Sequence, residues 1–189
     1  MAQTQDDALG EALDKAARLL GFGYPGGAIL EKEARHGNPK AYKLPIPSAN
    51  DRDKNRFSYS GLKTAFVRLF ENMNEPSRQD ISDLAALFQE AAFEHINKVL
   101  EYQILKHKHL GIKNLLFGGG VANNIEIRKK LRKTLNKHSI KLNIPYSKKL
   151  LGDNAGMIGV CAYLKNKEKD ISVYLDYKNV DRQPRLGIV

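Results

Sequence analysis

Cysteine is almost absent from this sequence, and that scarcity excludes two kinds of scaffold. Cys161 has no second cysteine to pair with, so an internal disulfide framework and a multi-cysteine zinc site are both ruled out. A lone thiol fits a reducing compartment. No apolar run approaches the roughly 20 residues that span a bilayer. Residues 1–7 are polar and acidic, unlike a secretory signal, so we expect a cytoplasmic protein.

Common hydrolase motifs are missing as well. The chain contains no Gly-x-Ser-x-Gly elbow and no His-Glu-x-x-His metalloprotease motif, and its five histidines include no pair spaced four apart. What is present is 189 residues, of which 42% are hydrophobic and 28% charged. This composition is typical of a folded, soluble protein that is long enough to bury a sizeable core.

Acidic residues are missing from residues 128–150, which hold nine Lys or Arg. The rest of the chain carries 22 basic and 21 acidic residues, so this stretch supplies nearly all of the net charge of +10. A basic stripe can neutralise RNA phosphates and release their counterions. It can equally be a solvated helix that keeps the protein soluble, and charge alone favours that second interpretation.

Hydrophobic spacing predicts a helix-rich first part of the chain. Apolar residues recur at helical intervals in four stretches, residues 4–20, 28–35, 62–73 and about 80–107. Between the second and third of these, residues 37–56 contain three prolines and read as an extended loop. A short strand is predicted at residues 57–60 because aromatic and small polar residues alternate there.

The second part of the chain predicts a parallel α/β unit. Elements of alternating type follow one another closely: a strand at 113–117, a helix from 123 or 124, a strand at 140–144 and a helix at 155–164. A further strand is expected at residues 171–174, in an otherwise loosely held tail.

Three consecutive glycines, Gly118 to Gly120, join the first of these strands to its helix. Glycines let backbone N–H groups approach a phosphate or ribose closely, and the helix N-terminus adds partial positive charge. Asn124 can then bond a sugar hydroxyl or a base edge. Alternatively, the glycines only form a tight turn and Asn123 or Asn124 caps the helix. Spacing leaves these two interpretations even.

Single carboxylates offer weaker signals. Asp153 stands at a strand-to-helix junction, where it can bind a metal, although a helix cap is the commoner use of such a residue. Asp14 lies mid-helix beside Lys15, which suggests an exposed ion pair. Glu31 reads as an ordinary helix-surface residue.

Five motifs nevertheless occur together in a recognisable order. They are GEALDK at residues 10–15, YPGG at 24–27, FSYSGLKT at 57–64, GGVANN at 119–124 and DNAGMI at 153–158. In this order and spacing the chain resembles the C-terminal half of the tRNA threonylcarbamoyladenosine transferase family, formerly labelled O-sialoglycoprotein endopeptidases. The resemblance extends from about Thr4 to Leu164.

The resemblance implies an α/β fold of the actin-like, Hsp70-like (ribonuclease H-like) ATPase type. This chain would form one helix-rich lobe, half of a two-lobed fold. Residues 1–164 would form the C-terminal lobe, with a helical insertion at about 1–110, and residues 165–189 a tail. It implies transfer of a threonylcarbamoyl group from its adenylate to an adenosine beside the anticodon of tRNA. The implied partners are tRNA, the other subunits of the transfer complex and an N-terminal lobe.

The resemblance also assigns residues. Those matching the adenine-nucleotide site are Asp14, Gly27, Glu31, Gly119, Gly120 and Asn124. Asp153 matches a ligand of a divalent metal, iron or zinc, one per subunit of the complete protein. The candidates for tRNA contact are Lys63, Arg128, Lys129, Lys130 and Lys133. We expect the glycine turn and Asp153 to form one wall of the nucleotide cleft.

Two departures from the family pattern stand out. The family's pair of metal-binding histidines lies well upstream of the segment that matches Asp14, and this sequence has only thirteen residues before Asp14. Gly152 occupies a position where the family usually has Thr or another polar residue. We therefore expect a fragment, a split gene product or a truncated chain, inactive by itself.

Two functions remain open at this stage. In the first, the chain supplies half of a metal-dependent acyltransferase site. In the second, it is a non-catalytic half-protein that binds a nucleotide, tRNA or partner subunits. A protease function rests only on the former label of the family, and no set of residues supports it.

Overall fold

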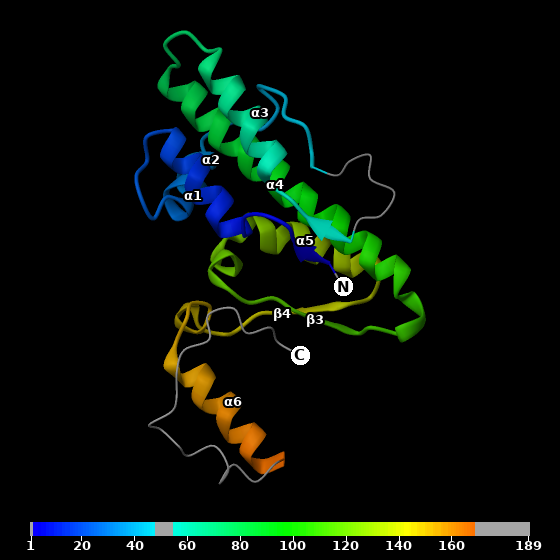
Figure 1. Cartoon of the computed structure of the whole chain (residues 1–189). Helices are drawn as coiled ribbons and strands as arrows, with labels where there is room; N and C mark the ends of the chain where they lie inside the picture. The colour runs from blue at the N-terminus through cyan, green and yellow to red at the C-terminus, as the bar shows by residue number, and fades with distance from the viewer. Residues whose placement is uncertain (1, 48–54, 169–189) are drawn as a thin grey trace. The chain divides into compact units, whose positions relative to one another are not determined.

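The structure is a computed structural model that describes residues 2–47 and 55–168 (Figure 1). The chain divides into two compact units, Met1–Leu151 and Gly152–Val189. Within the described residues, the first unit contains short strands, α-helices and 3-10 turns. In chain order these are β1 (Gln3–Thr4), α1 (Leu9–Leu19), α2 (Gly27–Ala34), β2 (Arg56–Phe57), α3 (Ser60–Glu71), α4 (Arg78–Lys106), η1 (Lys108–Leu110), β3 (Asn114–Leu116), η2 (Gly120–Asn123), α5 (Ile125–Lys137), β4 (Lys141–Asn143) and η3 (Lys148–Leu150).

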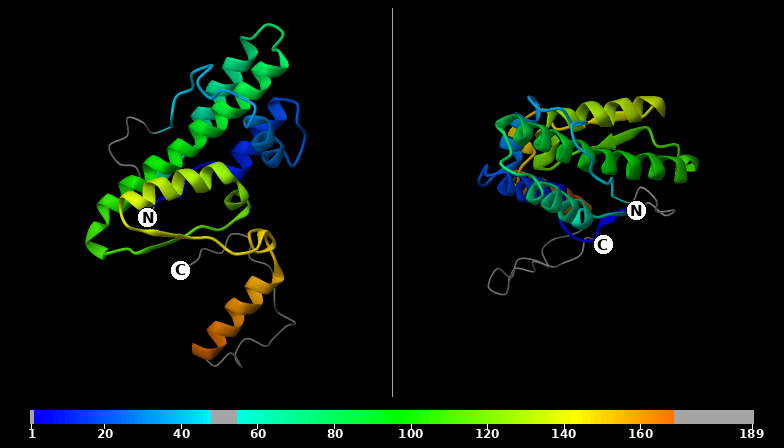
Figure 2. Two further views of the ribbon diagram at one scale, coloured as in Figure 1. Left: turned by 180° about the vertical axis from the view of Figure 1, so that it is seen from behind. Right: turned by 90° about the horizontal axis from the view of Figure 1, so that it is seen from above.

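The long helix α4 lies at the centre of the packing in the first unit. It begins at a capping box, in which the Ser77 side chain accepts from the Asp80 N–H and the Asp80 carboxylate accepts from the Ser77 N–H. Helices α1, α2, α3 and α5 pack against it (Figures 1 and 2). The core between them is apolar, and the rings of Phe66 and Phe88 meet there with centroids 4.8 Å apart.

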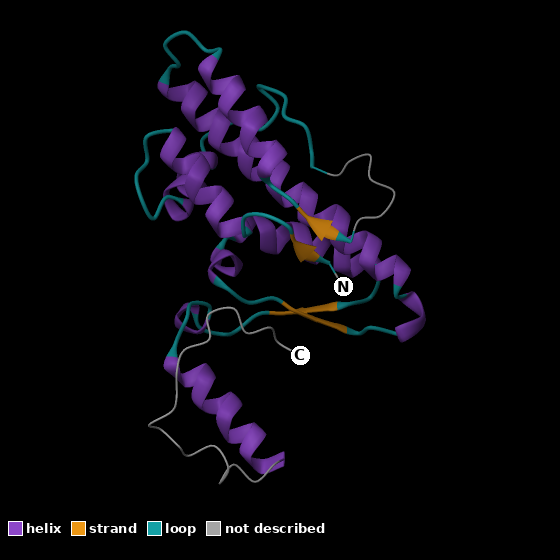
Figure 3. Ribbon diagram, in the orientation of Figure 1, coloured by secondary structure: helices purple, strands orange, loops and turns teal. Residues whose placement is uncertain are grey.

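Both sheets of the described residues are parallel pairs of strands (Figure 3). Strands β3 and β4 pair with Leu115 opposite Leu142, and α5 connects them. This confirms the predicted parallel α/β unit. Strands β1 and β2 pair with Thr4 opposite Phe57, a contact between distant segments that the sequence did not predict. The described residues therefore form a helix-rich α/β arrangement with two small parallel sheets.

Most predicted helices are confirmed. The predicted start of the first helix and the predicted extent of the strand before α3 are wrong. Helix α1 begins at Leu9 rather than at residue 4, because Thr4 belongs to β1. The strand predicted at 57–60 ends at Phe57, and Ser60 already begins α3. Asp6, which precedes α1 in the chain, bonds the start of α3 rather than its own helix.

The described residues of the second unit are 152–168, and they contain helix α6 (Ala155–Glu168). The Oδ1 atom of Asn154 accepts a hydrogen bond of 3.0 Å from the Met157 N–H, so Asn154 caps this helix. The strand predicted at 171–174 lies outside the described residues, and the predicted boundary between residues 164 and 165 stays a prediction. No helix in the described ranges is long and apolar enough to cross a membrane.

Candidate functional site

A cavity of about 860 Å³ lies within the first unit. This volume is in the range of sites that bind small molecules and cofactors. Residues of α1, α2, η2 and the β1–β2 region line the cavity. They include every residue predicted for the nucleotide site, namely Asp14, Gly27, Glu31, Gly119, Gly120 and Asn124. The structure thus brings these six residues to one place, while their contact with a nucleotide stays a prediction.

Asp14 joins α1 to the start of α2. Its Oδ1 atom accepts hydrogen bonds from the N–H groups of Gly26 at 2.9 Å and Gly27 at 2.7 Å. The expected ion pair with Lys15 is wrong, because Lys15 binds Asp7 and Glu11 instead. The second oxygen of Asp14 accepts no hydrogen bond from the described residues, which leaves an acceptor available in a residue that lines the cavity.

Glu31 links α2 to the start of α5. Its side chain is only 15% exposed, so it is not the ordinary surface residue that the sequence suggested. The Oε1 atom accepts from the Ile125 N–H at 3.1 Å and from Arg35 at 3.1 Å. Glu31 therefore helps to hold the two elements that form one corner of the cavity.

Asn124 uses both its amide oxygen and one N–H of its amide nitrogen within the protein, and the second N–H forms no hydrogen bond with the described residues. Its Oδ1 atom accepts from the N–H groups of Glu126 at 2.9 Å and Ile127 at 3.3 Å, which confirms the helix-cap interpretation. Its Nδ2 group donates to Gln89 at 2.8 Å in a buried contact. Because Glu31 takes the Ile125 N–H, the first three N–H groups of α5 already have acceptors. That arrangement disfavours a phosphate at this helix end.

The glycine turn keeps space open in the cavity. Gly119 has a φ of +84°, which explains its identity by backbone conformation alone. Gly118 and Gly120 have no positive φ, and a Cβ atom added at either would meet no protein atom within 4 Å. The fold therefore does not require glycine at 118 or 120, whereas a ligand lying against the backbone would.

The cavity lining combines two acidic side chains, some uncharged polar groups and large apolar residues. Among the described residues that form it, Asp14 and Glu31 are acidic and none is basic. Phe57, Ile96 and Phe117 contribute large apolar surfaces. Carboxylates accept hydrogen bonds from hydroxyl groups, and apolar walls suit a flat ring. The site therefore suits an uncharged nucleoside better than a bare phosphate.

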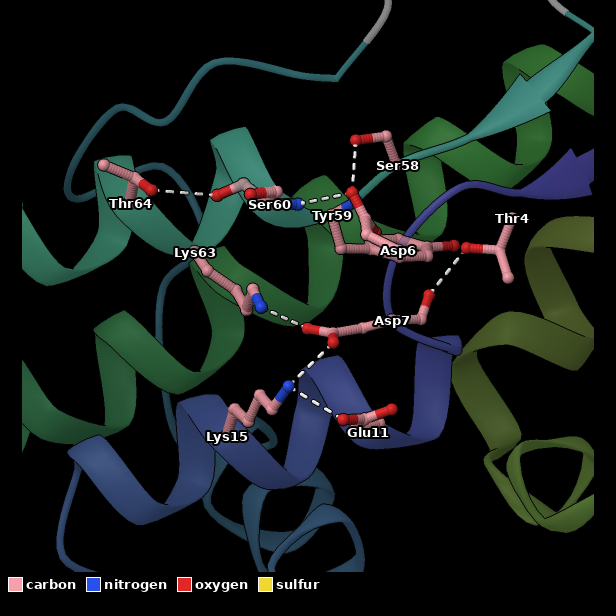
Figure 4. A network of polar contacts seen from close by, with 10 residues as sticks. All are labelled: Thr4, Asp6, Asp7, Glu11, Lys15, Ser58, Tyr59, Ser60, Lys63 and Thr64. Atoms are coloured by element: carbon pink, nitrogen blue, oxygen red, sulfur yellow. Dashed lines mark hydrogen bonds and ion pairs between the residues drawn. The ribbon is translucent and has the colours of Figure 1, made fainter.

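Asp6 organises the segment that precedes α3 (Figure 4). Its carboxylate accepts hydrogen bonds from the Ser58 hydroxyl at 2.6 Å, the Tyr59 N–H at 2.8 Å and the Ser60 N–H at 3.2 Å. Partial burial raises the pKa of Asp6, but these hydrogen bonds outweigh it and leave the pKa below its usual value. Asp6 thus caps α3 from outside the helix.

Asp7 binds two lysines from different helices (Figure 4). It pairs with Lys15 of α1 at 2.7 Å and with Lys63 of α3. Hydrogen bonds from Lys15 and then Lys63 lower the pKa of Asp7. Lys63, a candidate for tRNA contact, is therefore engaged within the protein. Sequence analysis missed this role of Asp7, since its partners are 8 and 56 residues away.

Tyr59 is a cavity residue that sequence analysis assigned only to a strand. It is 2% exposed, and its ring packs edge-on against His95 with centroids 5.5 Å apart. Burial, with the negative charge of Asp6, raises the pKa of the Tyr59 hydroxyl, so the group stays protonated. That hydroxyl forms no hydrogen bond with the described residues, although Tyr59 lines the cavity.

Besides Lys63, two more of the predicted tRNA-contacting lysines form ion pairs within the protein. Lys130 of α5 binds Glu90 at 2.5 Å and Glu94 at 2.8 Å, both on α4, and its side chain is only 20% exposed. Lys129 pairs with Glu126 at 2.7 Å. Lys130 therefore holds α5 against α4, and part of the basic stripe is neutralised.

Other basic side chains of α5 remain open to solvent. Arg132 and Lys133 are exposed and form no ion pair with the described residues. Arg128, by contrast, donates from Nε to the Ala122 carbonyl. Of the predicted candidates, Lys133 is thus the best placed to meet a phosphate, and Arg132 beside it is a candidate that the prediction omitted.

Asp153 does not form a metal site with its described neighbours. It is exposed, and no group of three His, Cys, Asp or Glu side chains able to hold a metal occurs among the described residues. One carboxylate is too few ligands for a stable site. Asp153 belongs to the second unit and the glycine turn to the first, so their convergence stays a prediction.

Comparison with known proteins agrees with the five motifs. The sequence pattern of the family described as "tRNA N6-adenosine threonylcarbamoyltransferase" (TsaD) matches residues 1–160. The chain belongs to this family. The TsaD match includes the glycine turn and every cavity residue predicted for the nucleotide site, which confirms the resemblance seen in the sequence.

Individual TsaD relatives show how much of the family's length is covered. A tRNA N6-adenosine threonylcarbamoyltransferase of Mycoplasma capricolum is 43% identical over 172 residues, which are 88% of this chain and 52% of that protein. The corresponding protein of Trichlorobacter lovleyi is 42% identical over 87% of this chain and 47% of its own length. The protein of Persephonella marina is 40% identical over 95% of this chain and 50% of its own length. The chain spans about half the length of these relatives.

Proposed function

We propose that this chain supplies the adenosine-binding half of a threonylcarbamoyl-transfer site that modifies tRNA. The observation that carries the proposal is the single cavity lined by all six predicted nucleotide residues. In the complete reaction, a threonylcarbamoyl group leaves its adenylate and joins an adenosine next to the anticodon of tRNA. The adenosine part of that adenylate is the ligand we assign to the cavity.

The lining suggests a role for each group of residues. The free oxygen of Asp14 and the carboxylate of Glu31 accept hydrogen bonds from ribose hydroxyls. Gly118 and Gly120 let the nucleoside lie close to the backbone. Phe57 and the other apolar residues exclude water from the base. The adenylate phosphate points away from α5, whose first N–H groups are taken.

The proposal extends to the family's fold and metal. An actin-like ATPase fold of two lobes would place this chain as the C-terminal lobe, residues 1–164, with the second lobe closing the site. Asp153 remains the candidate ligand for iron or zinc, but the described residues do not provide the further ligands. No step of the proposal depends on the metal.

Nucleoside binding tests the proposal directly. Titration calorimetry with adenosine should show saturable binding to the chain. Gly120→Val should weaken it at least tenfold, because the new side chain enters open space in the cavity. Gly61→Val is the matched control: Gly61 also faces open space but does not line the cavity. Equal affinity of the two variants, or no binding by the unmodified chain, contradicts the proposal.

An activity assay distinguishes the enzyme half from the alternative function, a non-catalytic binding protein. Both remain open because the chain covers only about half the length of its relatives. The chain replaces the corresponding half of the Mycoplasma capricolum relative. The chimera is incubated with tRNA, ATP, threonine, bicarbonate and the partner enzymes. Modified adenosine in the tRNA supports the transferase half. Adenosine binding without product in the chimera, while the intact relative is active, supports the binding protein.

A further inference from the structure

Tyr59 presents an unsatisfied hydroxyl to the cavity. The residue is 2% exposed and lines the cavity, and its backbone N–H is bound by Asp6. Its hydroxyl has no hydrogen-bond partner among the described residues. The hydroxyl keeps some accessible surface, because it is not one of the fully buried polar atoms that lack a partner. In a residue that lines the cavity, such a hydroxyl is available to a ligand.

The position of Tyr59 is fixed from three sides. Asp6 holds its backbone, its ring packs edge-on against His95, and α3 begins immediately after it at Ser60. Phe57 packs against the same His95 ring, with centroids 5.8 Å apart. The hydroxyl therefore cannot reorient freely toward solvent. Phe57 and Ile96 line the same cavity as Tyr59 and give it apolar surface.

We propose that the Tyr59 hydroxyl hydrogen-bonds the nucleobase of the ligand, and so contributes to recognition of adenine. The inference rests on the proposed nucleoside site. The carboxylates of the lining come from α1 and α2, whereas Tyr59 and Phe57 come from the segment before α3. A ribose bonds the carboxylate side, so the flat base lies on the aromatic side and meets the hydroxyl.

The variant Tyr59→Phe removes only the hydroxyl and keeps the ring packing. Adenosine affinity, measured by calorimetry, should fall about three- to tenfold, the effect of one neutral hydrogen bond. The thermal midpoint should stay unchanged or rise, because no internal hydrogen bond is lost. A fall in the midpoint without a change in affinity would mean a structural role for the hydroxyl and would overturn the inference.

Ligand analogues locate the contact. Purine riboside and the 1-, 3- and 7-deaza analogues of adenosine each alter one hydrogen-bonding position of the base. For one of these analogues, the one that already lacks the atom bonded by the hydroxyl, Tyr59→Phe should bind with the same affinity as the unmodified chain. A penalty that persists with all four places the hydroxyl on the ribose and overturns the assignment to the base.

Failure of this inference can be told from failure of the nucleoside site. If the unmodified chain binds adenosine and Gly120→Val does not, the site stands. Unchanged affinity in Tyr59→Phe then refutes only the role of the hydroxyl. If the unmodified chain does not bind adenosine at all, the site itself is refuted, and the inference with it.

Discussion

At the scale of single residues, structural roles fall on the same side chains as the predicted ligand contacts. Asn124 caps α5 through its amide oxygen and bonds Gln89 through one N–H, so one amide N–H stays available. Asp14 caps α2 through one oxygen and retains the other. The sequence offered helix cap and ligand contact as alternatives for Asn124 and an exposed ion pair for Asp14. In both residues the geometry combines a cap with a polar group to spare, one oxygen of Asp14 and one N–H of Asn124.

Asp7 gives a pH-dependent prediction at this scale. Its pKa is lowered from 3.8 by Lys15 and Lys63, so its ion pairs stabilise the fold above that pH and are lost as the carboxylate becomes protonated below it. Asp7→Asn should lower the free energy of unfolding by about 1–2 kcal/mol at pH 7. The difference from the unmodified chain should shrink in urea denaturation as pH falls below 3.8.

Glu11→Gln is the matched control for Asp7. Glu11 also pairs with Lys15 at 2.7 Å, but its side chain is 55% exposed. Exposed pairs contribute little, so this variant should change stability by less than about 0.5 kcal/mol at pH 7. A loss in Glu11→Gln as large as in Asp7→Asn would refute the special role of Asp7.

At the scale of elements, periodic patterns were read well and long-range pairings were not. Helices α2 and α4 and the β3–α5–β4 unit follow local spacing, so the sequence predicted them. Strands β1 and β2 have two residues each and exist because distant segments meet. No local pattern specifies such a contact. For the same reason, the sequence did not predict that Asp6 caps α3 or that Tyr59 lines the cavity: both depend on contacts between distant segments.

Two helix caps give a comparison at this scale. Ser77→Ala removes the exposed cap of α4 and should cost about 1 kcal/mol. Asn124→Ala removes the cap of α5 and also leaves the buried Gln89 without its donor, so it should cost about 2–3 kcal/mol. Urea denaturation of both variants measures the difference. Equal losses would show that the bond to Gln89 adds nothing.

At the scale of the whole molecule, the net charge of +10 is less available than the sequence suggests. Glu90 and Glu94 neutralise Lys130, while Arg132 and Lys133 remain exposed without ion pairs among the described residues. The charge count located the basic stripe correctly. It could not assign partners, because the neutralising acids come from α4, about 40 residues away.

A charge-reversal pair tests the proposed tRNA contact of α5. Arg132→Glu with Lys133→Glu should weaken tRNA binding and reduce the slope of log affinity against log salt by about 1–2. Arg18→Glu with Lys32→Glu makes the same charge change at exposed sites on α1 and α2 and should have a smaller effect. Filter binding over a range of salt measures both. Indistinguishable slopes would refute a tRNA contact by α5.

The central claim is that adenosine occupies the cavity between the glycine turn, α1 and α2. Its most direct test is the change in backbone amide NMR signals when adenosine is added to the chain. The account predicts that the largest changes fall on residues 27, 28, 59 and 118–121, which line the cavity. Changes confined to the exposed face of α5, with those residues unaffected, would contradict it.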